Sequence, residues 1–293
     1  TNLVGGWLGS RLGLHLTMLS GMTLQILALG MLAAPDPWLS VVYVMAAQAL
    51  SGIAKDLNKM SAKASIKSLA DVAPGQSKLF TLVAALTGSK NALKGVGFFL
   101  GAVLLQVAGF RGSMLLLAGL LAVTLLASTA LLPRALGKMR EKPRFRDVFS
   151  KSPSINRLAG ARFFLFGARD VWFVVGLPVF LHATLDWQFA EVGAFFAAWI
   201  IGYGIVQAIA PRLWHRGEPP GGRAALAFVA SLTLIPFAIA AGLESGFAPG
   251  PVVVLGLTAF GVVFAVNSSI HSFLVLAYSK HDRVSMDVGF YYM

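Results

Sequence analysis

The sequence predicts an all-α polytopic membrane protein, and three observations lead to this fold class. Hydrophobic residues make up 57% of the chain and charged residues only 12%, whereas a soluble domain has about 25% charged residues. Apolar runs of roughly 20 residues, the length that an α-helix needs to cross a bilayer, recur along the chain. The net charge of +12 comes from basic residues placed between these runs rather than in one patch, which argues against nucleic acid as a partner.

Along the chain, eight apolar segments are long enough to span the membrane, and prolines mark most of the joints between them. Two shorter apolar segments at the ends predict partial spans. The complete spans are expected at 15–33, 38–60, 79–109, 112–133, 156–183, 188–211, 223–243 and 249–278, and the partial ones at 1–8 and 286–293.

The distribution of basic residues predicts which connections face the cytoplasm. Nineteen of the 24 lysines and arginines lie in every second connection, and the other connections hold only Arg111. Because cytoplasmic loops carry such an excess of positive charge, the basic set is predicted to be cytoplasmic. It comprises residues 9–14, 55–78, 134–157, 212–223 and 279–287. The remaining basic residues lie inside spans and are Lys90, Lys94, Arg162 and Arg169.

A basic segment at residues 134–155 divides the chain into two similar halves. Residues 1–133 predict an N-terminal half-bundle and residues 156–293 a C-terminal one. Two helical bundles in parallel repeat, joined by a cytoplasmic linker, resemble the plan of the major facilitator superfamily. On this plan both pseudo-symmetric bundles are incomplete. The chain is expected to run from the end of the second helix to the start of the eleventh, without the first helix, most of the second and the last helices.

The stretch "GGWLGSRLG" resembles the signature turn of that superfamily, which reads approximately G-x-L-A-D-R-x-G. Gly6, Leu8, Arg11 and Gly13 match. Glycine allows the tight turn and the close backbone approach, and Arg11 supplies a cytoplasmic charge. Ser10 stands at the aspartate position, so the charge relay of the superfamily lacks its acid here. The alternative is a cytoplasmic turn of any helical membrane protein.

Four lysines at four-residue spacing form one stripe on a helix: Lys55, Lys59, Lys63 and Lys67. Lys63 and Lys67 are interpreted as a solvated helix end whose ammonium groups reach toward the lipid headgroups. Lys55 and Lys59 are predicted to lie deeper and are candidate substrate-binding residues. Asp56 beside them is a candidate for coupling or charge pairing. The alternative is that these residues also belong to the solvated helix end.

A second pair of lysines lies in "GSKNALKGVGFFLG", where Lys90 and Lys94 share a helical face with Gly97 and Gly101. Glycines on a membrane helix favour contact with another helix. We therefore expect these lysines to face protein or a cavity, where they are candidates for substrate binding. For Lys90 the alternative is snorkelling toward the cytoplasm.

The strongest signal is "ARFFLFGARDVWFVV", which places Arg169 and Asp170 near the centre of a span. Each charge there costs roughly 2.5–3.5 kcal/mol on insertion scales and normally faces the bundle interior or a watery cavity. Arg162 lies two turns earlier on nearly the same face. The two arginines are candidate substrate-binding residues, and Asp170 is a candidate for coupling or charge pairing. The alternative is an Arg–Asp pair that only stabilises helix packing.

Two further polar residues, Asn267 and His271, lie one turn apart in the apolar stretch "GVVFAVNSSIHSFLVLAY". Asn267 is a candidate for binding substrate and His271 for carrying a coupling proton. The alternative for His271 is a packing and hydrogen-bonding role. The chain has no phosphate-binding P-loop, no H-E-x-x-H motif and no cysteine. We therefore expect no enzyme activity, no cofactor and no metal site.

Several longer stretches together resemble the ArsJ-type organoarsenical efflux permeases of the major facilitator superfamily. They are "ALSGIAKDLNKMSAK", "LTGSKNALKGVGFFLG", "LFGARDVWFVVGLPVFLH", "IGYGIVQAIAPRL", "GVVFAVNSSIHSFLVLAY" and "VGFYYM". The resemblance implies export of 1-arseno-3-phosphoglycerate, which confers arsenate resistance. It also implies a functional partner, the glyceraldehyde-3-phosphate dehydrogenase that makes this compound from arsenate. The expected location is the bacterial inner membrane, and the expected state is a monomer.

The predicted substrate suits the charges inside the spans. A phosphate and an arsenate group carry several negative charges, and guanidinium groups bind such oxyanions bidentately. Two alternatives remain open. One is a major facilitator exporter of another organic anion or drug. The other is a non-transporting membrane scaffold that recruits the dehydrogenase through the basic linker.

Overall fold

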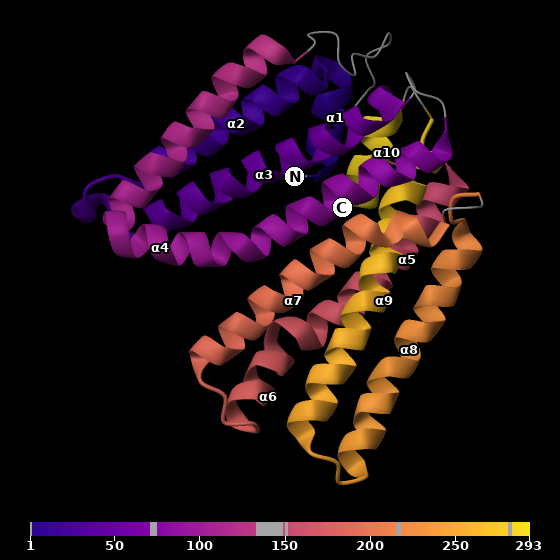
Figure 1. Ribbon diagram of the computed structural model, residues 1–293. Helices are drawn as coiled ribbons and strands as arrows, with labels where there is room; N and C mark the ends of the chain where they lie inside the picture. The colour runs from indigo at the N-terminus through magenta and orange to yellow at the C-terminus, as the bar shows by residue number, and fades with distance from the viewer. Residues whose placement is uncertain (1, 71–74, 133–148, 150–151, 215–217, 281–282) are drawn as a thin grey trace. The chain divides into compact units, whose positions relative to one another are not determined.

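Every regular element that the computed structural model describes is a helix (Figure 1). The described residues are 2–70, 75–132, 149, 152–214, 218–280 and 283–293. The α-helices are α1 (Asn2–Leu12), α2 (Leu14–Leu32), α3 (Val41–Ala70), α4 (Gln76–Leu131), α5 (Pro153–Val171), α6 (Leu177–Ala183), α7 (Phe189–Ile209), α8 (Gly222–Glu244), α9 (Pro249–Tyr278) and α10 (Val284–Tyr291). Short 3-10 turns lie at Asp36–Trp38 and Ala210–Trp214. A π-helical turn, η3, joins α5 to α6 at Trp172–Gly176.

Two glycines separate helices where the sequence predicts a break. Gly13 has a φ of 94° and divides α1 from α2. Gly109 has a φ of 65° and interrupts α4, between the spans predicted at 79–109 and 112–133. Residues with a side chain rarely adopt such positive φ angles, whereas glycine does so without steric cost. The predicted order of helices along the chain is thereby confirmed.

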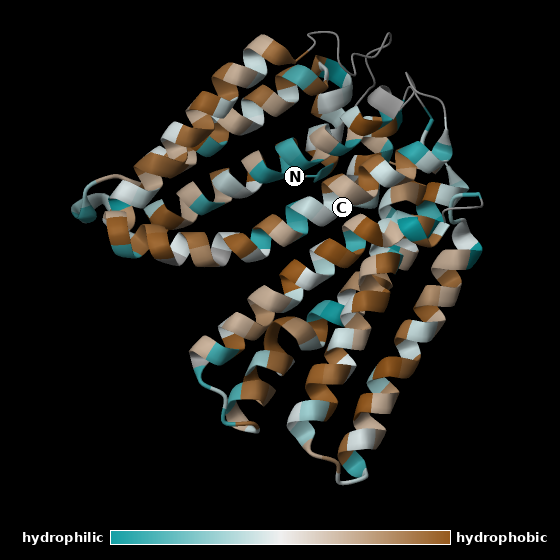
Figure 2. Ribbon diagram, in the orientation of Figure 1, coloured by the Kyte–Doolittle hydropathy of each residue, from teal (hydrophilic) through white to brown (hydrophobic). Residues whose placement is uncertain are grey.

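Six helical segments in the described residues are long and apolar enough to cross a membrane: Leu14–Leu32, Val103–Leu131, Pro153–Ala183, Ala190–Trp214, Gly222–Glu244 and Pro249–Tyr278. The sequence predicts eight. The two that fall short are α3 and the first part of α4, the helices that carry the candidate lysines. Figure 2 shows this difference, because α3 is marked with more hydrophilic residues than α8 or the second part of α4.

Contacts divide the chain into two compact units, which are described separately. The first unit comprises residues 1–73, 100–156 and 278–293, and the second comprises residues 74–99 and 157–277. The units interleave along the chain, so they do not test the division into half-bundles 1–133 and 156–293, which stays a prediction. The basic linker predicted at 134–155 lies almost wholly outside the described residues.

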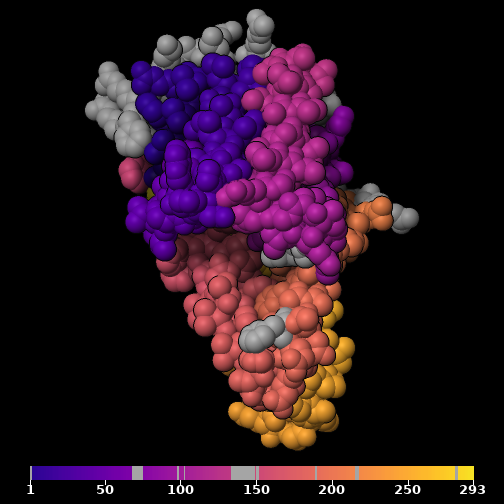
Figure 3. Space-filling view, turned by 90° about the vertical axis from the view of Figure 1, so that its left-hand side faces the viewer, coloured from indigo at the N-terminus to yellow at the C-terminus, as the bar shows by residue number. Residues whose placement is uncertain are grey.

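In the first unit, α2 packs closely along α3. The Ser51 hydroxyl donates to Oε1 of Gln25 at 3.0 Å, and a Cβ added at Gly21 would lie 3.1 Å from the carbonyl oxygen of Ala54. Figure 3 shows the N-terminal helices of this unit, in indigo and violet, as one closely packed surface. Asp36 and Arg111 form an ion pair at 2.8 Å. This pair places the connections at 34–37 and 110–111 at the same end of the unit, as the predicted alternation of connections requires.

Helix α10 packs against α1 with the backbones almost in contact. A Cβ added at Gly6 would lie 2.6 Å from the carbonyl oxygen of Ser285 and 3.1 Å from the Cα of Gly289. The Ser285 hydroxyl donates to the carbonyl oxygen of Gly6 at 2.8 Å. No side chain larger than hydrogen fits at Gly6 without moving one of the helices.

In the second unit, aromatic side chains fill the space between α5, α7 and α9. One core cluster centres on Leu177, Leu181 and Leu257, and another on Tyr203, Phe260 and Phe264. The Trp199 indole N–H donates to the carbonyl oxygen of Leu257 at 2.9 Å and thereby ties α7 to α9.

The first part of α4 crosses α7 at small residues. A Cβ added at Gly204 would lie 2.3 Å from the backbone nitrogen of Ala92, and one added at Gly88 would lie 2.5 Å from the carbonyl oxygen of Gly204. By contrast, a Cβ added at Gly97 or Gly101 would have no described atom within 4 Å outside its own helix turn. The first part of α4 thus packs on α7 through the face that carries Gly88, and the prediction that Gly97 and Gly101 mark a helix contact stays a prediction.

Candidate functional site

The two arginines of α5 share one face of the helix, as the sequence predicts. The Arg162 guanidinium lies 3.9 Å from the centroid of the Phe166 ring, and the Arg169 guanidinium lies 5.1 Å from the same ring. Arg169 also lies 4.9 Å from the ring of Phe264 on α9. Cations at such distances are attracted by the ring electrons. Phe166 therefore lies between two guanidinium groups, and α9 covers one of them.

Asp170 is the direct partner of Arg169. The Nε of Arg169 donates to Oδ1 of Asp170 at 2.8 Å, and Nη2 donates to the same oxygen. The Arg169 side chain is 21% exposed and the Asp170 side chain 50% exposed. The pair is thus accessible from one side, although it lies well inside the membrane-spanning segment Pro153–Ala183.

Of the two candidates on α9, His271 lies near the arginines, where it interacts electrostatically with Arg162. The His271 side chain is buried, and Asn267 is completely buried with no hydrogen-bond partner for either atom of its amide group. The structure therefore brings His271 near Arg162, whereas Arg169 lies against Phe264 of the same helix. Asn267 and His271 are closed off from solvent in this conformation.

A buried network around Gln207 on α7 lies beside these residues and is missed by the sequence reasoning. Oε1 of Gln207 accepts from the Asn91 amide at 2.6 Å, and Nε2 of Gln207 donates to the Ser268 hydroxyl at 3.1 Å. The Ser269 hydroxyl donates to the backbone oxygen of Gln207 at 2.8 Å. The sequence feature that could have indicated this network is a glutamine inside an apolar span, because polar groups there need hydrogen-bond partners.

The lysines of α4 and the first lysine of the α3 stripe are placed differently from the arginines. Lys90 and Lys94 are exposed on α4, away from the face that packs on α7, and Lys55 is exposed on α3. No contact between Lys94 and Arg169 occurs among the described residues. The convergence of lysines and arginines on one cavity stays a prediction.

The rest of the α3 stripe meets the residue that follows α10. The ammonium groups of Lys59 and Lys63 lie 4.6 and 4.2 Å from the centroid of the Tyr292 ring, and Lys63 donates to the Tyr292 hydroxyl. Lys67 donates to the backbone oxygen of Ser279 at 2.6 Å. Lys63 is only 5% exposed. The interpretation as a solvated helix end is therefore wrong for Lys63, which Tyr292 covers, whereas Lys67 is partly buried beside Ser279.

Asp56 and the signature-turn residues lie in the same unit. Asp56 is partly buried beside exposed Lys55. Gly6 makes the close contact with α10, and Gly13 provides the turn into α2. Arg11 is exposed and lies 5.2 Å from the centroid of the Trp7 ring. Ser10, at the position of the superfamily aspartate, is buried and donates to the backbone oxygen of Trp7 at 2.8 Å.

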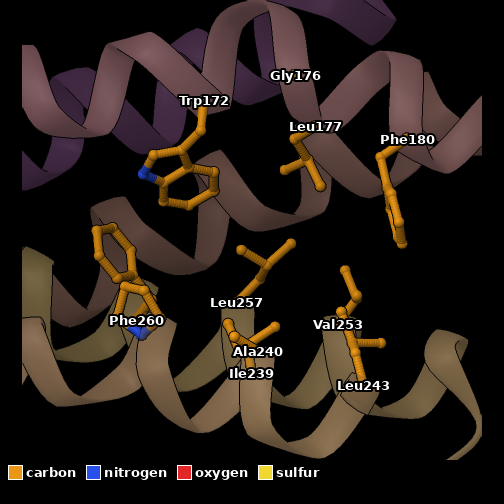
Figure 4. A pocket seen from close by; sticks show the side chains of 11 residues that line it. Trp172, Gly176, Leu177, Phe180, Ile239, Ala240, Leu243, Val253, Leu257 and Phe260 are labelled. Atoms are coloured by element: carbon orange, nitrogen blue, oxygen red, sulfur yellow. The ribbon is translucent and has the colours of Figure 1, made fainter. Parts of the chain in front are cut away.

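An apolar cavity of about 300 Å³ lies in the second unit, one helical turn beyond Asp170. Trp172, Leu177 and Phe180 form one wall, and residues of α8 and α9, including Val253, Leu257 and Phe260, form the other (Figure 4). The cavity has no charged lining residue and does not suit an anion. No cluster of three or more potential metal ligands occurs in the part of the chain that the structure describes.

Comparison with known proteins identifies the class. The profile of the Major Facilitator Superfamily matches residues 1–293, so the chain belongs to this superfamily of membrane transporters. Among solved structures, it is similar to the crystal structure of the human organic anion transporter MFSD10 (TETRAN), with a TM-score of 0.77 and 19% identity over 99% of this chain and 70% of that chain. No curated protein matches the sequence.

These findings agree with the fold derived from the sequence. The chain is a multi-pass membrane protein of the major facilitator superfamily, and it is a transporter rather than an enzyme. The likeness to the solved transporter, at 19% identity, concerns the fold.

Proposed function

We propose that this chain belongs to an exporter of an anionic organoarsenical, 1-arseno-3-phosphoglycerate, which works by alternating access and confers arsenate resistance. The observation that carries the proposal is the arginine face of α5. Arg162 and Arg169 lie on either side of Phe166 inside a membrane-spanning segment. Because each buried charge costs several kcal/mol in the membrane, two guanidinium groups on one face favour a binding role over a packing role.

The chemistry of the substrate fits this face. A phosphate and an arsenate group each present several oxygens to a donor, and a guanidinium group binds two of them side by side. The aromatic rings of Phe166 and Phe264 cover part of Arg169, and reduced contact with water strengthens such electrostatic interactions. The description of the structural neighbour as an organic anion transporter supports the same charge class.

The remaining parts of the proposal follow the resemblance. A glyceraldehyde-3-phosphate dehydrogenase supplies the substrate, and the transporter works as a monomer in a bacterial inner membrane. Lys55, Lys59, Lys90, Lys94 and Asn267 join the arginines in binding the anion during the transport cycle. Asp56, Asp170 and His271 serve coupling or charge pairing. The buried state of Asn267 and His271 requires that they act in another conformation of the cycle.

We also infer that α1, α3 and α10 close the cytoplasmic end of the first unit. The Gly6–Gly289 approach and the contact of two lysines with Tyr292 are short-range and specific. The position of the signature-turn aspartate is Ser10. In this chain, these cation–π contacts and the close glycine packing hold α10 against α1 and α3 in the closed state.

The test of the function is the loss of resistance in a single variant. Arg169→Ala in the complete protein should abolish arsenate resistance in cells that still insert the protein in the membrane, because the anion then loses its bidentate donor. Arg111→Ala is the matched control, since Arg111 lies in a connection and pairs with Asp36. Normal resistance of the Arg169→Ala cells would remove Arg169 from the mechanism.

A second candidate is the export of a different organic anion, which the description of the structural neighbour favours. Everted vesicles separate the two candidates. Uptake of arsenic that depends on the dehydrogenase, glyceraldehyde 3-phosphate, NAD and arsenate supports the arsenate ester. Uptake of a non-arsenical anion such as 3-phosphoglycerate, without uptake of the ester, supports the second candidate.

A further inference from the structure

We propose that Asp170 is a built-in competitor of the transported anion, because its carboxylate occupies one of the two edges with which Arg169 can bind an oxyanion bidentately. This inference rests on the proposed function, which assigns substrate contact to Arg169. It adds a separate role for Asp170, which sets the affinity of the site and allows release of the anion.

The hydrogen bonds identify the occupied edge. Nε and Nη2 of Arg169 both donate to Oδ1 of Asp170. These two donors form one of the two forks with which arginine binds two oxygens of a carboxylate or phosphate side by side. Asp170 gives this fork a single oxygen. An arsenate or phosphate group offers two oxygens to the same donors and is therefore the better ligand.

The positions of the two residues in the chain make their pairing weak. Adjacent residues on a helix do not face each other, so the guanidinium must bend toward its neighbour to form the bond. The partner that can move is the carboxylate. Arg169 is held between the rings of Phe166 and Phe264 and is 21% exposed, whereas Asp170 is 50% exposed. An incoming anion can therefore displace Asp170 while Arg169 stays in place.

The replacement of Asp170 by the anion also keeps the Arg169 guanidinium paired with a negative charge throughout the transport cycle. An isolated guanidinium near the bilayer centre is costly, and Asp170 neutralises it when no substrate is bound. The bound anion then takes over this neutralisation. When the anion leaves, Asp170 returns to Arg169, and the release is helped by the same interaction that competed with binding.

The test compares Asp170→Asn with the unchanged protein in everted vesicles that contain the complete transporter. The arsenate ester is produced outside the vesicles by the dehydrogenase from glyceraldehyde 3-phosphate, NAD and arsenate, and its steady-state level is varied. We expect the KM of Asp170→Asn to fall about fivefold, the size expected from the loss of a partly exposed ion pair. The maximal rate should also fall, because the release of the anion becomes slower.

Two controls accompany this comparison. Asp170→Glu keeps a carboxylate and should keep a KM close to that of the unchanged protein. Asp36→Asn removes the acid of the other Arg–Asp pair, with Arg111, and should leave both KM and maximal rate unchanged. If Asp170→Asn does not reach the membrane, Asp170→Ser provides a second neutral side chain.

The outcomes separate this inference from the proposed function. A defect of folding alone would lower the maximal rate without lowering the KM. Loss of transport in Arg169→Ala together with an unchanged or higher KM in Asp170→Asn would overturn the competitor role and leave the function intact. Absence of ester uptake by the unchanged protein would instead overturn the proposed function. Normal ester uptake by Arg169→Ala would leave export of the ester intact and would overturn both the role of Arg169 and the competitor role of Asp170.

Discussion

At the scale of single residues, Gln207 connects three helices of the second unit. Its side chain is completely buried, and it joins Asn91 on α4 to Ser268 on α9. Buried polar groups in proteins are almost always hydrogen-bonded, and an unsatisfied one costs about 1–3 kcal/mol. Each partner of Gln207 therefore depends on it.

We expect Gln207→Leu to lower the midpoint of thermal unfolding in detergent, because Asn91 and Ser268 each lose a buried partner. The cost should reach about 1–3 kcal/mol for each group left unsatisfied. Gln106→Leu is the control, since Gln106 is exposed on α4 and the change should leave the midpoint nearly unaltered. Equal midpoints for the two variants would show that the network does not stabilise the fold.

Residue-level prediction succeeded where helical geometry alone decides the result. The shared face of Arg162 and Arg169 follows from their spacing and is confirmed by their common contact with Phe166. The network of Gln207 could not be predicted, because residues 91, 207 and 268 are far apart in the sequence. Substrate contact by any of the candidate residues stays a prediction.

At the scale of helices, the order of the elements follows from apolar length, prolines and glycines with positive φ such as Gly13 and Gly109. The face of each helix that packs against a neighbour could not be predicted from these sequence features. Helix α4 carries glycines on more than one face, and its actual partner is α7, whose Gly204 approaches Gly88. Similarly, Lys63 resembles a solvated residue in the sequence, and only the position of α10 shows that it is buried.

The contacts of α10 lead to a prediction about closure. In a Ser10→Cys variant the thiol is the only one in this chain, which has no cysteine, and it replaces a side chain that is 1% exposed. Adding Tyr292→Leu should speed its reaction with N-ethylmaleimide, because Lys59 and Lys63 lose their cation–π contacts with this ring. A cation–π contact of this kind contributes about 0.5–2 kcal/mol, so the rate should rise several-fold.

Two further variants control this labelling experiment. Tyr292→Phe keeps the ring and should give a rate between those of the parent and Tyr292→Leu. Tyr278→Leu changes an exposed tyrosine and should leave the rate unchanged. Equal labelling rates with and without Tyr292→Leu would rule out the proposed closing role of Tyr292.

At the scale of the whole molecule, the fold class was predictable from composition and charge distribution, and the superfamily match over residues 1–293 confirms it. The Asp36–Arg111 ion pair also agrees with the predicted alternation of connections. It joins two of the connections that are predicted to face away from the cytoplasm, at one end of the first unit. The division into half-bundles was predicted from the basic linker, and it stays a prediction.

The orientation in the membrane can be checked with reporter fusions. Alkaline phosphatase, which is active only outside the cytoplasm, should be active when fused after Pro35 or Gly246 and inactive when fused after Gly221. The physical reason is the excess of lysine and arginine in the connections predicted to be cytoplasmic. The opposite pattern of activity would reverse the assigned orientation.

The π-helical turn at Trp172–Gly176 separates two parts of one span with different surroundings. Before it lie the arginines that face Phe166, and after it lie Leu177 and Leu181 of an apolar core cluster. A π turn holds one residue more than an α turn, so the side chains of α6 are rotated relative to those of α5. Deletion of one residue in this turn would thus rotate α6 and replace the side chains that line the apolar cavity, while the arginine face of α5 would stay unchanged. The cavity can therefore change in evolution independently of the arginine face.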